Sequence, residues 1–177
     1  WRRLPEKTEV MDVNLDWKQW RHVFKLDPDR PLADKAVERI CRSGTDAILI
    51  GGSTGVTYAG TAGLLQRVRR FAVPCVLEVS AADAIVPGFD FYLVPVVLNT
   101  DAGEWITGHH QRALRRFGDA VDWGQLAAEG YIILNGDSAA ARLTGAKAVD
   151  SEEDFLAYVR LADRLFRLPI VYVEYSG

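Results

Sequence analysis

A lysine stands inside an otherwise apolar run of the sequence, Val23-Phe24-Lys25-Leu26, and an aspartate follows at position 27. A lysine on a buried strand has to meet an anion, because burying an unpaired ammonium group is costly. Lys25 therefore either binds an anionic ligand or forms a structural ion pair with Glu78. Asp27 either binds a metal ion or caps the turn before Pro28. The sequence alone leaves these alternatives open.

Further polar residues stand directly after other apolar runs. They are Gly51, Gly52, Ser53, Glu78, Ser80, Asn99, Asn135, Glu174, Tyr175, Ser176 and Gly177. Together with Lys25 and Asp27, this set holds one cation, several carboxylates and small hydroxyl groups. Such a set suits a phosphorylated, hydroxylated small molecule bound together with Mg²⁺.

Other kinds of chemistry are less well supported. The segment 51–55 lets the backbone approach an oxyanion or forms a tight strand-to-helix turn, and it matches neither a P-loop nor a dinucleotide motif. His109 and His110 lack the HExxH spacing, which favours a hydrogen-bonded or solvent-facing pair over a metal site. Cys41 and Cys75 have no metal-binding spacing and are predicted to be buried, reduced thiols. The sequence contains no GxSxG motif of a serine hydrolase.

The elements that position these residues follow from the hydrophobic pattern. Short β-branched runs at 23–26, 47–50, 75–79, 91–98, 131–134 and 170–175 alternate with helical patterns at 32–42, 59–71, 104–117 and 151–166. This order predicts a parallel sheet, either open and doubly wound or closed as a (β/α)8 barrel. In both folds ligands bind beyond the carboxyl ends of the strands, so the polar residues share one mouth.

Local signals refine this outline. Pro95 lies inside the fourth strand and predicts a bulge. Ser151, three residues before Asp154, predicts a helix N-cap. The spacing of Trp17, Trp20 and Phe24 is interpreted as N-terminal packing rather than as a platform for base stacking.

Composition sets the protein class. The chain has 177 residues, 49% of them hydrophobic and 25% charged, with a formal net charge of -3, which is typical of one soluble globular domain. The mild acidity argues against nucleic-acid binding, and Arg67, Arg69 and Arg70 are interpreted as a solvated helix end. The sequence has neither an apolar run long enough for a membrane span nor the apolar core of a signal peptide, so we expect a cytoplasmic protein.

Domain boundaries are predicted near the N-terminus. Met11 is the only methionine, so residues 1–10 are interpreted as an upstream extension. Residues 1–16 are taken as extension and lead-in, and 17–177 as one barrel domain. The end of the chain directly after a strand indicates an interrupted strand–helix unit.

Several motifs in this order resemble the bacterial heptaprenylglyceryl phosphate synthase (PcrB) family, which is related to archaeal geranylgeranylglyceryl phosphate synthases. They are Trp20-Arg21-His22-Val23-Phe24-Lys25-Leu26-Asp27-Pro28, Ser43-Gly44-Thr45-Asp46-Ala47, Gly51-Gly52-Ser53, Val73-Pro74-Cys75-Val76-Leu77-Glu78-Val79-Ser80, Ile85-Val86-Pro87-Gly88-Phe89-Asp90 and Tyr172-Val173-Glu174-Tyr175-Ser176-Gly177. The resemblance runs from about Trp17 to the last residue.

The resemblance implies a (β/α)8 barrel that joins a long polyprenyl diphosphate to sn-glycerol 1-phosphate. The reaction forms an ether and releases diphosphate with Mg²⁺. It also implies a homodimer and transient contact with a membrane for the lipid product. Family members continue through two further strand–helix units beyond the point where this sequence ends. The alternative is therefore a truncated, catalytically inactive member that acts as a binding or assembly module.

The resemblance also implies residue roles. Asp27 and Ser53 match the Mg²⁺ site, and Lys25 matches the lysine that contacts glycerol phosphate. The segment Tyr172, Val173, Glu174, Tyr175, Ser176 and Gly177 matches the part that holds glycerol phosphate. Glu174 is placed to orient the glycerol hydroxyls and to accept a proton. Ala113 matches the position that limits the prenyl groove, and its small side chain favours a heptaprenyl (C35) tail over a C20 tail.

Overall fold

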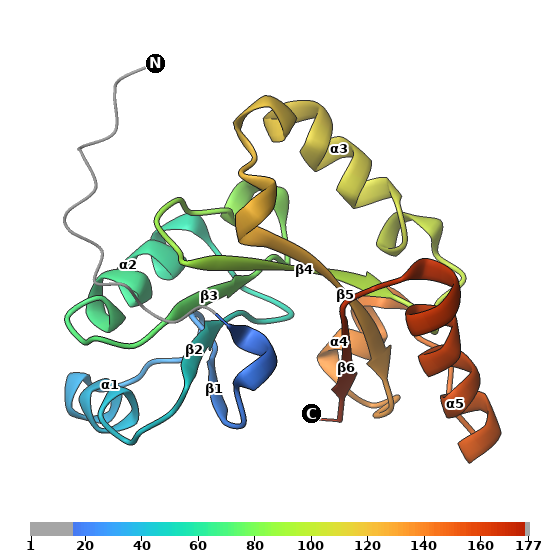
Figure 1. Cartoon of the computed structure of the whole chain (residues 1–177), viewed down its shortest axis with the longest axis horizontal. Helices are drawn as coiled ribbons and strands as arrows, with labels where there is room; N and C mark the ends of the chain where they lie inside the picture. Colours follow the sequence, from blue (N-terminus) through green and yellow to red (C-terminus); the bar gives the residue numbers. More distant parts are fainter. Residues whose placement is uncertain (1–15, 176–177) are drawn as a thin grey trace.

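The computed structural model of the chain describes residues 16–175 (Figure 1). The prediction for residues 1–10 and the expected site residues Ser176 and Gly177 lie outside this range. The strands are β1 (Val23–Leu26), β2 (Ala47–Ile50), β3 (Cys75–Glu78), β4 (Phe91–Val97), β5 (Leu126–Ile133) and β6 (Ile170–Glu174). The helices are α1 (Asp34–Cys41), α2 (Tyr58–Val68), α3 (Gly108–Phe117), α4 (Ala139–Thr144) and α5 (Glu152–Arg160).

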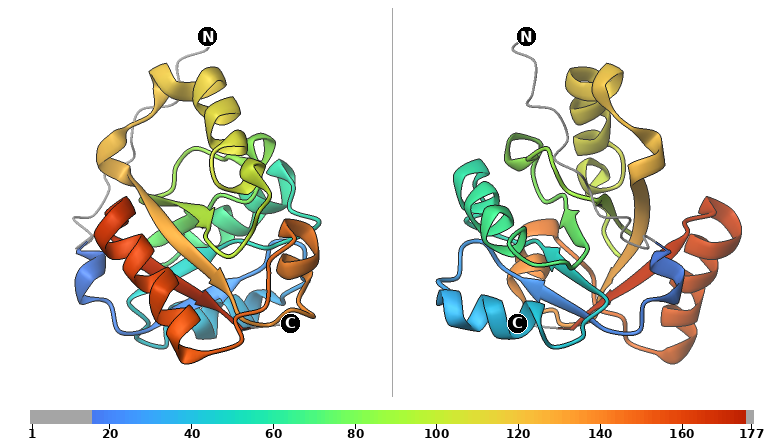
Figure 2. Two further views of the ribbon diagram at one scale, coloured as in Figure 1. Left: turned by 90° about the vertical axis from the view of Figure 1, so that its right-hand side faces the viewer. Right: turned by 60° about the vertical axis from the view of Figure 1, so that its left-hand side comes forward.

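All strand pairs are parallel, and the strand order β1-β2-β3-β4-β5-β6 follows the order of the chain. The sheet is strongly curved, with α1, α2 and α5 on its outer side (Figure 1, Figure 2). A doubly wound sheet reverses its strand order at a switch point, whereas a barrel does not. The curved sheet and its strand order therefore confirm the barrel alternative.

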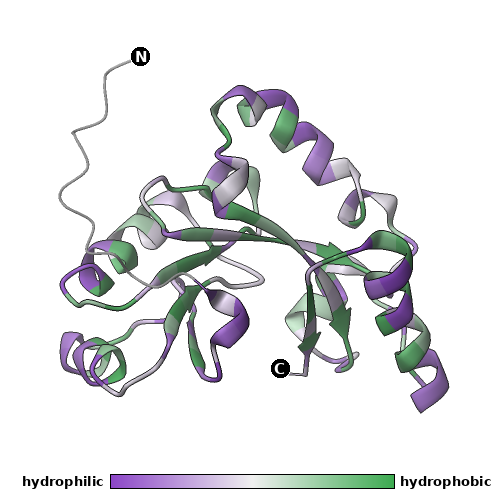
Figure 3. Cartoon of the chain, viewed as in Figure 1, coloured by the Kyte–Doolittle hydropathy of each residue, from purple (hydrophilic) through white to green (hydrophobic). Residues whose placement is uncertain are grey.

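Two faces of the sheet bury different apolar layers. On the outer face, Ile48 and Leu77 pack with Val37 of α1 and with residues of α2. On the inner face, a second cluster gathers Leu49 and Val76, and Trp17 and Trp20 pack against it. This contact confirms the predicted N-terminal packing for the two tryptophans. Phe24 instead packs against the cluster on the outer face. Figure 3 shows that the strands are mostly apolar, whereas the helices carry both apolar and hydrophilic residues.

Strand β5 begins at Leu126, well before the predicted start at Tyr131. The early part of the strand contains alanine, glutamate and glycine, which have low strand propensity. Pairing with β4 on one side and β6 on the other overrides that preference. Helix α4 was not predicted; it is only six residues long, and the Ser138 hydroxyl caps it by accepting from the backbone N–H of Ala141.

The predicted bulge at Pro95 is wrong, because β4 pairs with β5 in unbroken register from Tyr92 to Val97. Leu98 N–H donates to β5, and Leu93 C=O accepts from Val79 beyond the end of β3. By alternation, the missing N–H of Pro95 points to the β3 side, where that strand has already ended. No ladder hydrogen bond is lost there.

Helix boundaries also differ from the pattern. The predicted helix 104–117 is divided into a 3₁₀-turn (Gly103–Trp105) and α3, consistent with the low helix propensity of the glycines at 103 and 108. The Ser151 N-cap is confirmed, since its hydroxyl accepts from Asp154 N–H at 3.1 Å. Within the described part of the chain, no helix is long and apolar enough to cross a bilayer.

The interpretation of the arginines at the end of α2 as a solvated helix end is wrong for two of them. Arg67 donates to Asp34 and Arg69 donates to the buried Asp90 at 2.6 Å. The two arginine side chains therefore pair with carboxylates of the chain instead of extending into solvent. The two cysteines are free thiols, as predicted, although Cys41 is only half-buried.

Replacing Asp90 is expected to destabilise the fold. Its Oδ2 atom accepts from Arg69 and from the buried backbone N–H of Cys75 at 2.7 Å. Asp90→Ala should lower the free energy of unfolding by about 3 kcal/mol, because it leaves both donors without this partner. Urea denaturation measures the change. The control Asp101→Ala removes an exposed pair with Lys147 and should cost less than about 1 kcal/mol; equal costs would contradict the prediction.

Candidate active site

An ion pair lies at the carboxyl end of the curved sheet. Lys25 Nζ is 2.8 Å from Glu78 Oε1 and 2.9 Å from Glu78 Oε2, and Glu174 Oε2 lies at 4.0 Å. Both carboxylates are buried, whereas the Lys25 side chain keeps about 30% of its surface exposed. The ion-pair alternative for Lys25 is therefore realised. The Lys25 side chain is thus not fully enclosed by the two carboxylates.

Two tyrosines form the wall behind this ion pair. Tyr131 of β5 and Tyr172 of β6 are register partners, and their rings stack with centroids 4.8 Å apart. Lys25 Nζ lies 5.0 Å from the Tyr172 ring centroid, within cation–π range. Tyr131 Oη donates to Glu174 Oε2 at 2.9 Å. The cluster thus fixes Glu174 by a neutral donor and surrounds Lys25 by carboxylates and aromatic faces.

Burial and charge set the protonation of the cluster. Burial alone would lower the pKa of Lys25, but Glu78, Tyr172 and Glu174 together outweigh it and raise the pKa above its usual value. Burial raises the pKa of Glu78, and the attraction of Lys25 opposes that shift. Burial, with the nearby carboxylates, also raises the pKa of Tyr131. Lys25 is therefore charged and Tyr131 neutral at pH 7.

A third carboxyl group, Glu129, lies inside the sheet on β5 and is fully buried. Neither of its oxygens has a hydrogen-bond partner among the described residues. Burial, followed by the charge of Glu78, raises the pKa of Glu129 to about 8. Sequence analysis missed both Glu129 and Tyr131 as site residues. Glu129 falls between the predicted helix 104–117 and the predicted strand 131–134, and only an earlier start of β5 would have placed it in the interior.

The glycine-rich loop after β2 makes room for carboxylates of this chain. A Cβ on Gly51 would lie 2.8 Å from Glu78 Cβ, and a Cβ on Gly52 would lie 2.6 Å from Asp27 Oδ1. Asp27 Oδ1 accepts from Asp29 N–H at 2.9 Å, so Asp27 caps its turn. The groups that approach these two glycines closely are therefore side chains of this chain.

Asp27 and Ser53 come from neighbouring strand ends, after β1 and β2. Asp27 lies against Gly52, the residue that precedes Ser53. Among residues 16–175, no group of three or more His, Cys, Asp or Glu side chains could hold a metal ion. The two residues therefore offer a small set of oxygen donors rather than a complete protein cage.

A cavity of about 160 Å³ leads from this loop to α3. Ser53, Glu78 and Tyr131 line it beside the ion pair, and His109, His110 and Arg112 of α3 also line it. The rest of the lining is mainly apolar. The apolar lining includes Val94, Val97, Trp105, Ala113, Ala140 and Leu143. The structure therefore places Ala113 in the wall of the cavity that opens beside the ion pair.

The histidine pair forms hydrogen bonds, as predicted. His110 Nε2 lies 2.8 Å from Pro95 O, and His109 Nδ1 lies 3.0 Å from Arg112. The His110 contact joins α3 to β4.

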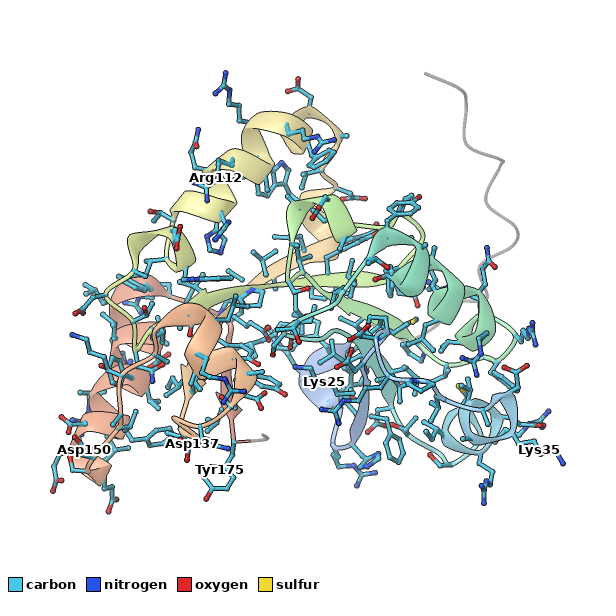
Figure 4. All side chains as sticks on the ribbon, turned by 180° about the vertical axis from the view of Figure 1, so that it is seen from behind. Lys25, Lys35, Arg112, Asp137, Asp150 and Tyr175 are labelled. Carbon is cyan, nitrogen blue, oxygen red and sulfur yellow. The ribbon has the colours of Figure 1, made fainter. Side chains whose placement is uncertain are left out.

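Several other predicted site residues lie outside the cluster around Lys25. Asn99 is buried and bonds to the backbone of Ile133, and Asn135 Oδ1 accepts from the backbone N–H of Asp137, so both stabilise the local backbone. Val173 alternates with the inward Tyr172 and is 41% exposed. Tyr175 is 74% exposed and points away from the rest of the molecule (Figure 4). Lys25, Tyr172 and Glu174 are brought together; Val173 and Tyr175 are not part of that cluster.

Gly51→Ala should destabilise the protein, because the new Cβ would collide with Glu78 Cβ, which cannot move without its strand. We expect a loss of about 1–3 kcal/mol in the free energy of unfolding. Chemical denaturation measures it. Gly63→Ala on α2 is the matched control, since its Cβ would meet no atom within 4 Å, and alanine favours a helix by up to about 1 kcal/mol. A Gly51→Ala variant as stable as this control would contradict the prediction.

Comparison with known proteins agrees with this geometry. Residues 15–177 match the model of the PcrB family. The heptaprenylglyceryl phosphate synthases of Bacillus thuringiensis (strain Al Hakam) and Bacillus cereus (strain AH187) are each 55% identical over 162 residues, which is 92% of this chain and 71% of theirs.

Two solved structures share the fold. The GGGPS of Thermoplasma volcanium has a TM-score of 0.76 at 21% identity, over 89% of this chain and 65% of that chain. The (S)-3-O-geranylgeranylglyceryl phosphate synthase of Thermoplasma acidophilum, in complex with sn-glycerol-1-phosphate, has a TM-score of 0.75 at 22% identity, over 88% of this chain and 65% of that chain. The chain thus spans about two-thirds of the length of these solved proteins. The family match over residues 15–177 and the 55% identity to curated relatives show that the chain belongs to the PcrB family.

Proposed function

We propose that this chain is a prenyltransferase that joins heptaprenyl diphosphate to sn-glycerol 1-phosphate, forming an ether and releasing diphosphate. One observation carries the proposal: a single cavity is lined both by Glu78 and Tyr131 of the ion-pair cluster and by many apolar side chains. That arrangement suits a small polar acceptor beside a long apolar donor. The names of the relatives that are 55% identical support the same reaction.

The acceptor would bind at the ion pair. Lys25 supplies the positive charge for the phosphate, and Glu174 accepts hydrogen bonds from the glycerol hydroxyls. Tyr131 holds Glu174 Oε2 in place, so the carboxylate is oriented before the acceptor arrives. The oxygen of the terminal glycerol hydroxyl bonds to the allylic carbon of the donor as the diphosphate leaves. Glu174 takes the proton that this hydroxyl loses. Tyr172 contributes the aromatic wall, and the outward Val173 would contribute through its backbone.

The donor set fits Mg²⁺. This ion is usually held by one or two carboxylates together with substrate phosphates, rather than by a complete protein cage. Asp27 and Ser53 offer hard oxygen atoms at adjacent strand ends, and Gly52 leaves the space that the Asp27 carboxylate occupies. When bound, the ion neutralises charge on the departing diphosphate. Asp27 and Ser53 would hold it.

The apolar end of the cavity would hold the prenyl tail. Ala113 leaves this end open, because a methyl side chain occupies little of the space between α3 and β4. Helix α3 also carries Arg112, Arg115 and Arg116 and no acidic residue, and Leu114 on the same helix is 41% exposed. A basic helix with an exposed apolar residue suits transient contact with an anionic membrane surface, from which a long prenyl donor would enter.

The direct test is turnover of radiolabelled sn-glycerol 1-phosphate with heptaprenyl diphosphate and Mg²⁺. A prenylated, solvent-extractable product supports the proposal. Absence of product in a protein that still binds both substrates would favour the alternative of an inactive binding or assembly module.

Asp27→Ala should abolish Mg²⁺-dependent transfer. The free energy of unfolding should change by only about 1 kcal/mol, the usual effect of losing a side-chain cap. Transfer assays over a range of Mg²⁺ concentrations, with urea denaturation in parallel, measure both effects. Asp29→Ala, which removes the exposed carboxylate two residues later, is the control. Unchanged transfer in Asp27→Ala would remove Asp27 from the metal site.

Ala113→Trp should shift the donor preference from a C35 to a C20 tail. The indole ring would fill the apolar end of the cavity, and each buried CH₂ that the longer tail loses there is worth about 0.8 kcal/mol. Competition between the two donors measures the preference directly. Transfer from the C20 donor should persist, since the polar cluster is unchanged. An unaltered preference would mean that the tail does not run along Ala113.

A further inference from the structure

Glu129 is a buried titratable group that the proposed reaction does not use. It has no exposed surface, and neither carboxyl oxygen has a hydrogen-bond partner within residues 16–175. An ionised carboxylate in such a place loses its hydration and gains no hydrogen bond in return. The uncharged form of Glu129 is therefore strongly favoured.

Its place in the fold connects Glu129 to the ion pair. Side chains two apart on a strand share one face, so Glu129 lies on the inner face of β5 with Tyr131, one layer deeper. In a barrel, one interior layer is filled by alternate strands. Lys25 of β1, Glu78 of β3 and Glu129 of β5 are such a set, and the two charged groups that act on Glu129 are Glu78 and Lys25.

The charge balance of this layer leaves no described cation for Glu129. Lys25 supplies the positive charge of the layer formed by Lys25, Glu78 and Glu129. Its ammonium group already binds both oxygens of Glu78, at 2.8 and 2.9 Å. The other titratable groups around this interior are Tyr131 on β5 and Tyr172 and Glu174 on β6, while β4 places the uncharged Pro95 opposite Glu129 in register. Ionised Glu129 would add a negative charge without a counter-ion.

We propose that Glu129 is a positioning residue whose uncharged carboxyl keeps the Lys25 ammonium available to the phosphate of the acceptor. The inference rests on the proposed function for the identity of that acceptor. When Glu129 loses its proton, the added negative charge competes for Lys25 and repels the incoming phosphate. The raised pKa of Glu129 places this change on the alkaline side of neutrality.

Binding of sn-glycerol 1-phosphate, measured by calorimetry at pH 7 and pH 9, tests this role. A phosphate monoester has its second pKa at about 6, so the ligand carries two charges at both values. The wild-type protein should bind about tenfold more weakly at pH 9, the order expected for one added charge nearby at a dielectric constant near 20. Glu129→Gln, which stays neutral and keeps the shape, should bind equally at both values.

Glu153→Gln, an exposed position on α5, is the matched control and should behave as the wild type. Equal losses of affinity in the wild type and Glu129→Gln would overturn the proposal, because another group would then be titrating. Direct titration gives a second readout that needs no ligand. The ¹³C-carboxyl resonance that Glu129→Gln removes should titrate near pH 8 in the wild type; a midpoint below pH 5 would overturn the proposal.

Turnover separates this inference from the proposed function. Prenyl transfer with identical pH profiles in the wild type and Glu129→Gln would overturn the role of Glu129 and leave the function standing. No transfer at any pH, together with a pH-dependent glycerol phosphate affinity only in proteins that retain Glu129, would overturn the function and support the role of Glu129.

Discussion

The contact between Lys25 and Glu78 governs the mouth of this protein. It joins β1 to β3 across the end of β2. It therefore limits which residue can follow β2 at position 51. Glu78 can reach the lysine only because position 51 carries no side chain. Burying a carboxylate requires a cation at contact distance, so the lysine, the glutamate and the glycine form one interdependent unit. The tyrosines, Glu174 and the cavity are arranged around it.

The sequence was sufficient for the architecture where local and tertiary preferences agree. The strands β1, β2, β3 and β6 are β-branched and apolar, and they were found close to their true bounds. The start of β5 was missed because its alanines and glycine carry no strand signal and gain their conformation from two neighbours. Pro95 was misjudged because the effect of a missing N–H depends on which neighbouring strand it faces, and on where that strand ends.

The same distinction applies to the site. Lys25 and Glu174 could be found because each is a charged residue in or directly after an apolar run. Tyr131 and Glu129 could not, since a tyrosine in a strand is usually part of the core and Glu129 lay outside every predicted element. Their importance comes from register: pairing of β5 with β6 brings Tyr131 beside Tyr172 and within reach of Glu174. Register is a long-range property, and a single sequence does not display it.

Helix α3 contains no buried residue, and His110 links it to β4 through the carbonyl of Pro95. A helix held this lightly can open locally at a small fraction of the free energy needed to unfold the sheet. The α3 side of the cavity wall can therefore open locally while the sheet stays folded. Amide hydrogens of α3 would exchange with solvent long before those of β2 or β3. Helix α3 can thus open locally while the Lys25–Glu78 ion pair keeps its geometry.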